Sequence, residues 1–152
     1  MLGRSIADPH GLECAPGGVD GLALLDVETL LTRDKTLRAA TGRTADGASF
    51  AGYEMHMGVT QGADCARPFA AIDGDAGGQR RRDGAVSPDG RVAGTYLHGL
   101  FSDDAQRAAW LERLGGSASG MNYEQGVEET LDGFAAHLEA HLDIDRLLSL
   151  AR

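Results

Sequence analysis

His98 is the residue of this chain whose type and position best suit chemistry. It follows the apolar segment 92–97 and precedes Gly99, a residue type that lets backbone or a ligand approach closely. Sites gather at strand ends in α/β sheets, and an imidazole that titrates near neutral pH suits general acid–base catalysis. A structural histidine that closes a strand fits the same spacing, so a reaction would need a nucleophile or a substrate beside it.

A second polar group lies in the segment Gly52-Tyr53-Glu54-Met55-His56-Met57-Gly58. In a strand, Glu54 and His56 point to one face, and Tyr53 and the two methionines point to the other. The polar pair therefore either lines a cleft or lies on a wet sheet face, and the pattern alone leaves both readings open.

The two cysteines, Cys14 and Cys65, lie in settings that do not favour a reactive thiolate. They form no C-x-x-C pair, and neither lies in a strand-to-helix turn flanked by small residues. Glu13 and Asp64 would raise the pKa of the neighbouring thiol. We therefore expect neither an attacking cysteine, nor a zinc site, nor a disulfide framework.

The remaining histidines and the arginine triplet 80–82 carry weaker signals. His137 and His141 lie one helical turn apart, but no third ligand accompanies them, so we expect solvated residues on a helix flank and no metal site. His10, in a loop rich in proline and glycine, should be exposed. The arginine triplet should lie in a solvated loop.

The strands that must position these residues are expected in the first two thirds of the chain. Asp46-Gly47 is a tight-turn dipeptide, and residues 87–90 (SPDG) form a second turn signature before a strand that runs into His98. The predicted strands are 21–30, 36–41, 50–60, 84–86 and 91–97, and the predicted loops are 8–20 and 73–84.

Helices are expected at the end of the chain. Asp103 and Gln106 resemble a capping pair, and an apolar stripe at residues 105, 108, 111 and 114 predicts a helix over 103–114. A stronger stripe predicts a helix over 127–142, and a short last helix should start near Asp143. Strands first and helices last is an unusual order for a complete domain of alternating βα units.

Length and charge limit the function classes. The 152 residues suffice for one domain, and 22 glycines, about twice the usual share of roughly 7%, favour a turn-rich α/β fold. A net charge of -9 would repel a nucleic-acid backbone. We expect a cytoplasmic protein without a nucleic-acid or membrane partner, because the sequence shows neither a signal peptide nor a membrane-spanning apolar run.

Three segments in this order and spacing resemble the glutamine amidotransferase domain of the cobyric acid synthase family. They are Gly52 to Gly58, the stretch Asp83-Gly84-Ala85-Val86-Ser87, and Gly94-Thr95-Tyr96-Leu97-His98-Gly99-Leu100-Phe101. The resemblance runs from Met1 to the last helix. It implies the C-terminal portion of a class I amidotransferase domain over residues 1–152, with a flavodoxin-like, three-layer α/β fold.

The resemblance also implies a mechanism and site residues. In such domains a cysteine thiolate attacks the side-chain amide of glutamine, and a histidine, matched here by His98, manages the protons. Glu54, His56 and Tyr96 would lie near the glutamine. The ammonia would serve an ATP- and Mg²⁺-dependent synthetase domain that amidates corrin carboxylates in cobalamin biosynthesis, and this region itself would hold no cofactor.

Two departures from the family pattern affect this expectation. Leu100 stands two positions after the histidine, where many class I amidotransferases carry an acidic residue, so Glu54 is a candidate for orienting His98. The nucleophile elbow of the family comes just before the segment that resembles residues 1–7. We therefore expect a fragment that is inactive alone, whose missing partners are the preceding strands, the elbow and the synthetase domain.

The sequence leaves two alternatives open. The chain could be a non-catalytic module that binds glutamine around Glu54, His56 and Tyr96. It could also belong to a cobyrinic acid a,c-diamide synthase relative, although residues 52–58 argue against that reading.

Overall fold

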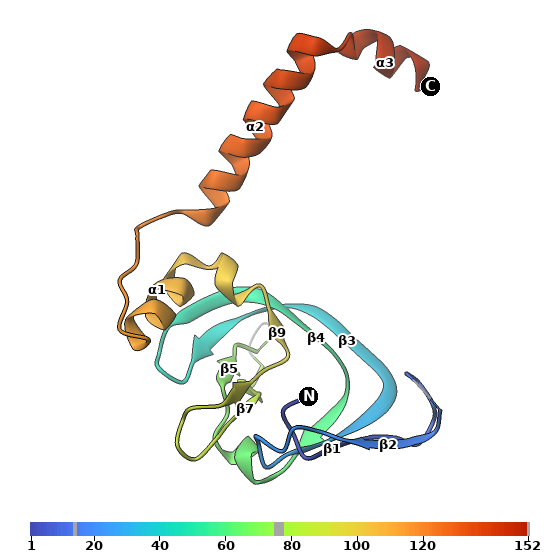
Figure 1. Cartoon of the computed structure of the whole chain (residues 1–152), viewed down its shortest axis with the longest axis vertical. Helices are drawn as coiled ribbons and strands as arrows, with labels where there is room; N and C mark the ends of the chain where they lie inside the picture. The colour runs from blue at the N-terminus through green and yellow to red at the C-terminus, as the bar shows by residue number, and fades with distance from the viewer. Residues whose placement is uncertain (14, 75–77, 152) are drawn as a thin grey trace.

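The structure is a computed structural model that describes residues 1–13, 15–74 and 78–151, and a long antiparallel hairpin dominates it (Figure 1). The hairpin consists of β3 (Glu28–Thr44) and β4 (Ser49–Gln61). The turn between them is the predicted one: Gly47 has a φ of 90°, and the Thr44 hydroxyl donates to the Asp46 carboxylate at 2.5 Å. Glycine is needed at this left-handed position because a Cβ would be strained there.

The described residues build a seven-stranded mixed sheet around this hairpin. β1 (Ser5–Asp8) runs parallel to β3 and antiparallel to β2 (Gly17–Asp20), while β9 (Leu97–His98) pairs with the other edge of β4. β5 (Ala70–Ile72) joins β3 and carries β6 (Arg81–Asp83). A separate two-stranded ladder consists of β7 (Ala85–Val86) and β8 (Ala93–Gly94).

The core lies on one face of the sheet, under the hairpin and its neighbours. Its main cluster unites residues from β3, β4, β5, β9 and the 3-10 turn η2 (Leu100–Ser102) with the residue that precedes β5: Ala40, Phe50, Phe69, Ala70, Ile72, Leu97 and Leu100. A second cluster consists of Leu25, Val27 and Ala85, near another 3-10 turn, η1 (Ala63–Ala66). β9 is therefore held by burial of Leu97 immediately beside His98.

Three predictions for residues 8–84 are corrected. Residues 8–20 are not all loop, because β2 pairs with β1. The apolar run 21–30 is a strand only from Glu28 onward, since the N–H groups of residues 21–25 donate to the carbonyls of residues 1–4 and so need no sheet partner. The predicted loop 73–84 contains β6, whereas residues 75–77 lie outside the described residues.

The strand predicted over 91–97 is broken into β8 and β9. The hairpin around residues 87–90 is confirmed by the β7–β8 pair, but the Thr95 hydroxyl and the Tyr96 N–H both donate to the Asp83 carboxylate. This polar anchor turns the chain between the two strands, and β9 then pairs with β4. His98 still lies at a strand end, as predicted.

Helices follow the strands, as the sequence predicted. They are α1 (Asp104–Arg113), α2 (Tyr123–His141) and α3 (Ile144–Leu150), and the side chains of Asp103, Asn122 and Asp143 cap their N-termini. The predicted apolar stripe of α1 is wrong: Leu111 and Leu114 are exposed, while Gln106 is fully buried. The Gln106 amide nitrogen donates to Thr44 Oγ1, Ala48 O and Ser49 O at 2.9 to 3.0 Å, and these bonds join α1 to the turn of the hairpin.

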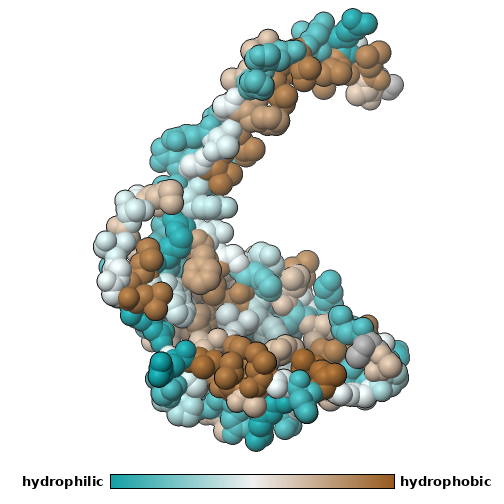
Figure 2. Space-filling view, viewed as in Figure 1, coloured by the Kyte–Doolittle hydropathy of each residue, from teal (hydrophilic) through white to brown (hydrophobic). Residues whose placement is uncertain are grey.

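The long helix α2 leads away from the sheet, followed by α3 (Figure 1). None of the residues of either helix is buried. The apolar stripe that predicted α2 is present, but it faces solvent, and Figure 2 shows the row of hydrophobic side chains along α2 and α3.

Candidate functional site

The His98 imidazole lies on the outer face of the sheet, the face opposite the core. β9 pairs with β4 so that Tyr53 stands directly opposite His98. Cross-strand neighbours share a face, and the two rings stack with centroids 5.1 Å apart and planes 11° apart. His98 is half-buried and borders a cavity of about 610 Å³ together with Phe101, Trp110 and Tyr123.

Two glycines allow β9 to lie this close to β4. A Cβ built on Gly52 would lie 2.2 Å from the His98 carbonyl oxygen, so a side chain at residue 52 would push the strands apart. Gly99 has a φ of 79°, a left-handed conformation that ends β9 immediately after the histidine. The sequence motif therefore positions His98 through backbone contacts.

The residue two positions after His98 belongs to the core. Leu100 belongs to the main hydrophobic cluster and is 6% exposed. Within the described residues, no hydrogen-bond partner is found for the His98 ring, so its orientation depends on the ring stack and the strand.

Glu54 and His56 lie together on the inner face of β4, which confirms the predicted alternation. The Glu54 side chain is 6% exposed and accepts hydrogen bonds from Arg38 (2.8 Å), Arg81 (3.0 Å) and His56 (3.1 Å). Burial alone would raise the pKa of Glu54, but the hydrogen bonds of Arg81, Arg38 and His56 outweigh it and lower this pKa from 4.5 to about 2. Glu54 is therefore an anion at neutral pH.

Arg81 corrects the prediction for the arginine triplet. Its guanidinium contacts Glu54 across the sheet, because β6 brings residue 81 to this face and the buried carboxylate attracts it. A solvated loop does not describe this residue.

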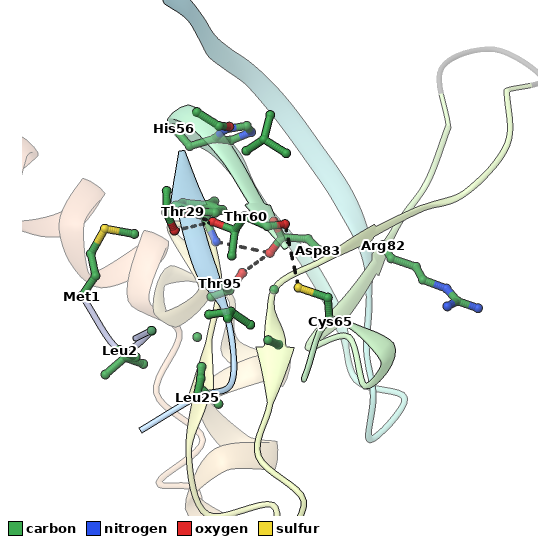
Figure 3. A pocket seen from close by; sticks show the side chains of 18 of the residues that line it. Met1, Leu2, Leu25, Thr29, His56, Thr60, Cys65, Arg82, Asp83 and Thr95 are labelled. Carbon is green, nitrogen blue, oxygen red and sulfur yellow. Dashed lines mark hydrogen bonds between the residues drawn. The ribbon is translucent and has the colours of Figure 1, made fainter. Parts of the chain in front are cut away.

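Glu54, His56 and Tyr96 line a cavity of about 470 Å³. Figure 3 shows this cavity, with His56, Thr60 and Asp83 labelled. The ring centroids of Tyr96 and His56 lie 4.8 Å apart, and the Tyr96 hydroxyl lies 2.6 Å from Thr60 Oγ1. The three predicted neighbours of glutamine are thus brought together.

Sequence reasoning missed Asp83, which lies in the same cavity. Burial raises the pKa of Asp83, hydrogen bonds from Thr95 and the Tyr96 N–H oppose this rise, and the negative charge of Glu54 adds to it. The only sequence signal was its place in the Asp83-Gly84-Ala85-Val86-Ser87 stretch of the family motif.

The cavity of Glu54 and the imidazole of His98 lie on opposite faces of β4. Tyr53, the partner of His98, precedes Glu54 by one residue, and successive strand residues point to opposite faces. The sequence makes Glu54 a candidate for orienting His98. The structure contradicts that role, because Glu54 bonds Arg38, Arg81 and His56 on the other face.

Cys65 is not placed as a nucleophile for His98. It lines the cavity of Glu54, and its thiol donates to the Thr60 carbonyl at 3.8 Å. Burial raises the pKa of the Cys65 thiol, and the charge of Asp64 raises it further. This agrees with the prediction that the thiol is not activated. Cys14 lies outside the described residues.

The remaining histidines are exposed, as predicted. His137 and His141 stack with centroids 4.2 Å apart, and His141 Nδ1 lies 2.8 Å from the His137 carbonyl. Over residues 1–13, 15–74 and 78–151, no three side chains of the metal-binding types come together as a candidate metal site.

Comparison with known proteins adds an independent observation. A family model described as "CobB/CobQ-like glutamine amidotransferase domain" matches residues 1–106. A cobyric acid synthase of Azorhizobium caulinodans and one of Methylorubrum populi are each 59% identical to the chain, and one of Paracoccus denitrificans is 57% identical. All three alignments cover the whole chain but only 30% of the relative.

The chain thus spans about 30% of the length of these curated relatives. In the part of the chain that the structure describes, no helix is both long and apolar enough to cross a membrane.

Proposed function

Because the chain belongs to the CobB/CobQ-like glutamine amidotransferase domain family, we propose that residues 1–152 form the C-terminal portion of such a domain, with His98 as its catalytic base. The mixed sheet followed by helices is consistent with the α/β fold of class I glutamine amidotransferases. The carrying observation is the position of His98 at the end of β9, beside an open cavity and inside the Gly94 to Phe101 motif.

In the proposed reaction, a thiolate attacks the side-chain carbonyl carbon of glutamine. Backbone N–H groups stabilise the resulting oxyanion, and His98 gives a proton to the nitrogen that leaves as ammonia. Water then attacks the glutamyl thioester, with His98 as the base, and glutamate leaves. The balance is glutamine and water to glutamate and ammonia.

The thiolate comes, in this proposal, from outside the described residues. Cys65 lies in the cavity on the other side of β4, and its raised pKa disfavours the thiolate at neutral pH. The described residues therefore supply the base.

The ammonia serves ATP-dependent amidation of corrin carboxylates in cobalamin biosynthesis. Support comes from the relatives that carry the name cobyric acid synthase and extend well beyond the aligned region. ATP and Mg²⁺ belong to the synthetase part of such a protein, which is the proposed acceptor of the ammonia.

A chimeric synthase tests the proposal. Residues 1–152 replace the matching segment of the Azorhizobium caulinodans protein, and glutamate release and amidation are measured with glutamine or with ammonium as the nitrogen donor. We expect His98→Ala to lower glutamine-dependent activity by about 10²- to 10⁴-fold, because proton transfer is lost, and to leave ammonium-dependent amidation intact. The exposed His137→Ala is the matched control and should change neither activity.

Two results would contradict the proposal. Glutaminase activity that survives His98→Ala would remove the histidine from the chemistry. An unaltered chimera that binds glutamine in a calorimetric titration without hydrolysing it would favour a glutamine-binding module.

A further inference from the structure

Tyr53 is the one side chain of the described residues whose ring stacks on His98. We propose that Tyr53 is the positioning residue of the His98 imidazole, in the role that an acidic residue has in Cys–His–acid triads. This inference rests on the proposed function, because it assigns a purpose to the orientation of the catalytic base.

The geometry of the pair suits this role. A centroid separation of 5.1 Å and an interplanar angle of 11° describe two rings in parallel contact, within the 4.5–7 Å range of favourable aromatic pairs. Contact over one ring face restricts the rotation of the imidazole about its side-chain bonds. Because both ring nitrogens lie at the ring edge, this contact leaves Nδ1 and Nε2 free to exchange protons, whereas a carboxylate would engage one of them.

The backbone fixes the two rings relative to each other. Tyr53 and His98 stand opposite each other in the β4–β9 register. Along the same edge of β4, the Met55 N–H donates to the Tyr96 carbonyl at 3.1 Å. The missing side chain at Gly52 lets the strands approach, and Tyr53 ring carbons lie 3.9 and 4.0 Å from where a Gly99 Cβ would be. The pairing of β4 with β9 therefore fixes the stack of the two rings.

No other described residue takes over the orienting role. Leu100 is buried in the core, and Glu54 is bound to two arginines and His56 on the opposite sheet face. The Tyr53 hydroxyl has no hydrogen bond within the described residues, so the aromatic ring carries the interaction.

A first experiment measures the stack in the 152-residue chain by NMR. Stacking on Tyr53 should shift the carbon-bound ring protons of His98 upfield, and Tyr53→Leu should abolish this shift. Tyr53→Phe should keep it, because the ring remains. Met55→Leu, two residues along the same sheet face, is the control and should leave the shift unchanged.

A second experiment measures glutaminase kinetics in the chimera. We expect Tyr53→Leu to lower kcat by roughly tenfold to a hundredfold, because a misaligned base transfers protons poorly, while KM for glutamine changes little. Tyr53→Phe should recover most of kcat. A purely structural role of Tyr53 would not produce this separation of kcat from KM together with the recovery by phenylalanine.

The outcomes separate this inference from the proposed function. If Tyr53→Leu retains the kcat of the unaltered chimera while His98→Ala is inactive, the positioning role is overturned and the proposed function stands. If His98→Ala is active, the proposed function falls, and the inference falls with it. An unchanged His98 shift in Tyr53→Leu also overturns the positioning role.

Discussion

Glu54 is the most strongly perturbed titratable residue among those described, and two cations compensate its burial. Arg38 stands directly opposite it in the β3–β4 register, while Arg81 reaches it from β6. A buried carboxylate that lost these partners would be costly, since an unpaired charge in the interior is strongly destabilising. This ion cluster fixes β6 to the hairpin.

The lowered pKa of Glu54 makes the stability of the chain depend on pH. A carboxylate whose pKa falls from 4.5 to about 2 on folding contributes stability above about pH 4.5, and this contribution is lost as the pH falls toward 2. We expect Glu54→Gln to lower the free energy of unfolding at pH 7 by about 2 kcal/mol, allowing for solvent screening of the partly exposed arginines. Urea unfolding of both proteins over a pH series measures it.

The matched control for this prediction is Glu28→Gln. Glu28 pairs with Arg4 at 3.6 Å, but both side chains are more than half exposed, so the effect should stay below about 0.5 kcal/mol. A difference between wild type and Glu54→Gln that is the same at pH 7 and near the pKa of Glu54 would contradict the prediction.

The sequence predicts this site only in part. Strand alternation correctly separates Glu54 and His56 from Tyr53, and the Asp46-Gly47 turn fixes a register in which Arg38 faces Glu54. Arg81 could not be assigned, because its contact depends on a strand that pairs only through β5. The placement of His98 opposite Tyr53 likewise depends on the long-range β4–β9 pair.

At the scale of elements, the sequence predicts the structure correctly where one or two residues determine the local backbone. The β3–β4 turn and the cap by Asp103 are such cases, because turn and cap residues act on their own backbone. The predicted pairing of Gln106 with this cap is wrong, because the Gln106 side chain bonds the hairpin turn instead. The break between β8 and β9 was not predictable from the apolar run 92–97, since Asp83, twelve residues before Thr95, causes it. Burial of Gln106 depends likewise on carbonyls of a distant turn.

Gly52→Ala tests the close approach of β9 and β4. The new methyl group would lie 2.2 Å from the His98 carbonyl oxygen, so the strands must separate, at a cost of roughly 1–3 kcal/mol. We expect faster hydrogen exchange of the Met55 amide, whose acceptor is the Tyr96 carbonyl, and loss of the Tyr53–His98 stack.

The control is Gly133→Ala in α2, where a Cβ would meet nothing within 4 Å. Removing glycine from a helix interior should stabilise the helix by up to about 1 kcal/mol and leave exchange at Met55 unchanged. Unaltered exchange at Met55 in Gly52→Ala would show that the strands tolerate the methyl group.

At the scale of the whole molecule, two apolar surfaces lack cover within the described residues. One is the outer face of the hairpin, with Leu37, Tyr53 and Met55 exposed, and it includes the partner of His98. The other is the apolar stripe of α2 and α3, where Phe134 and Leu148 are more than half exposed (Figure 2). Contiguous surfaces of this kind mark contacts with other protein segments.

We therefore expect the 152-residue chain to self-associate when it is isolated. Its net charge of -9 at pH 7 opposes association, so added salt should strengthen it by screening that repulsion. Sedimentation velocity at low and high salt measures the effect, and the dye ANS reports the exposed apolar surface.

Leu37→Lys and Leu148→Lys should each weaken association, because each places a charge in one of the two surfaces. Glu112→Gln, exposed on α1, is the control and should have little effect. A chain that stays monomeric at every salt concentration, binds no ANS and unfolds in one sharp transition would show that these surfaces need no partner.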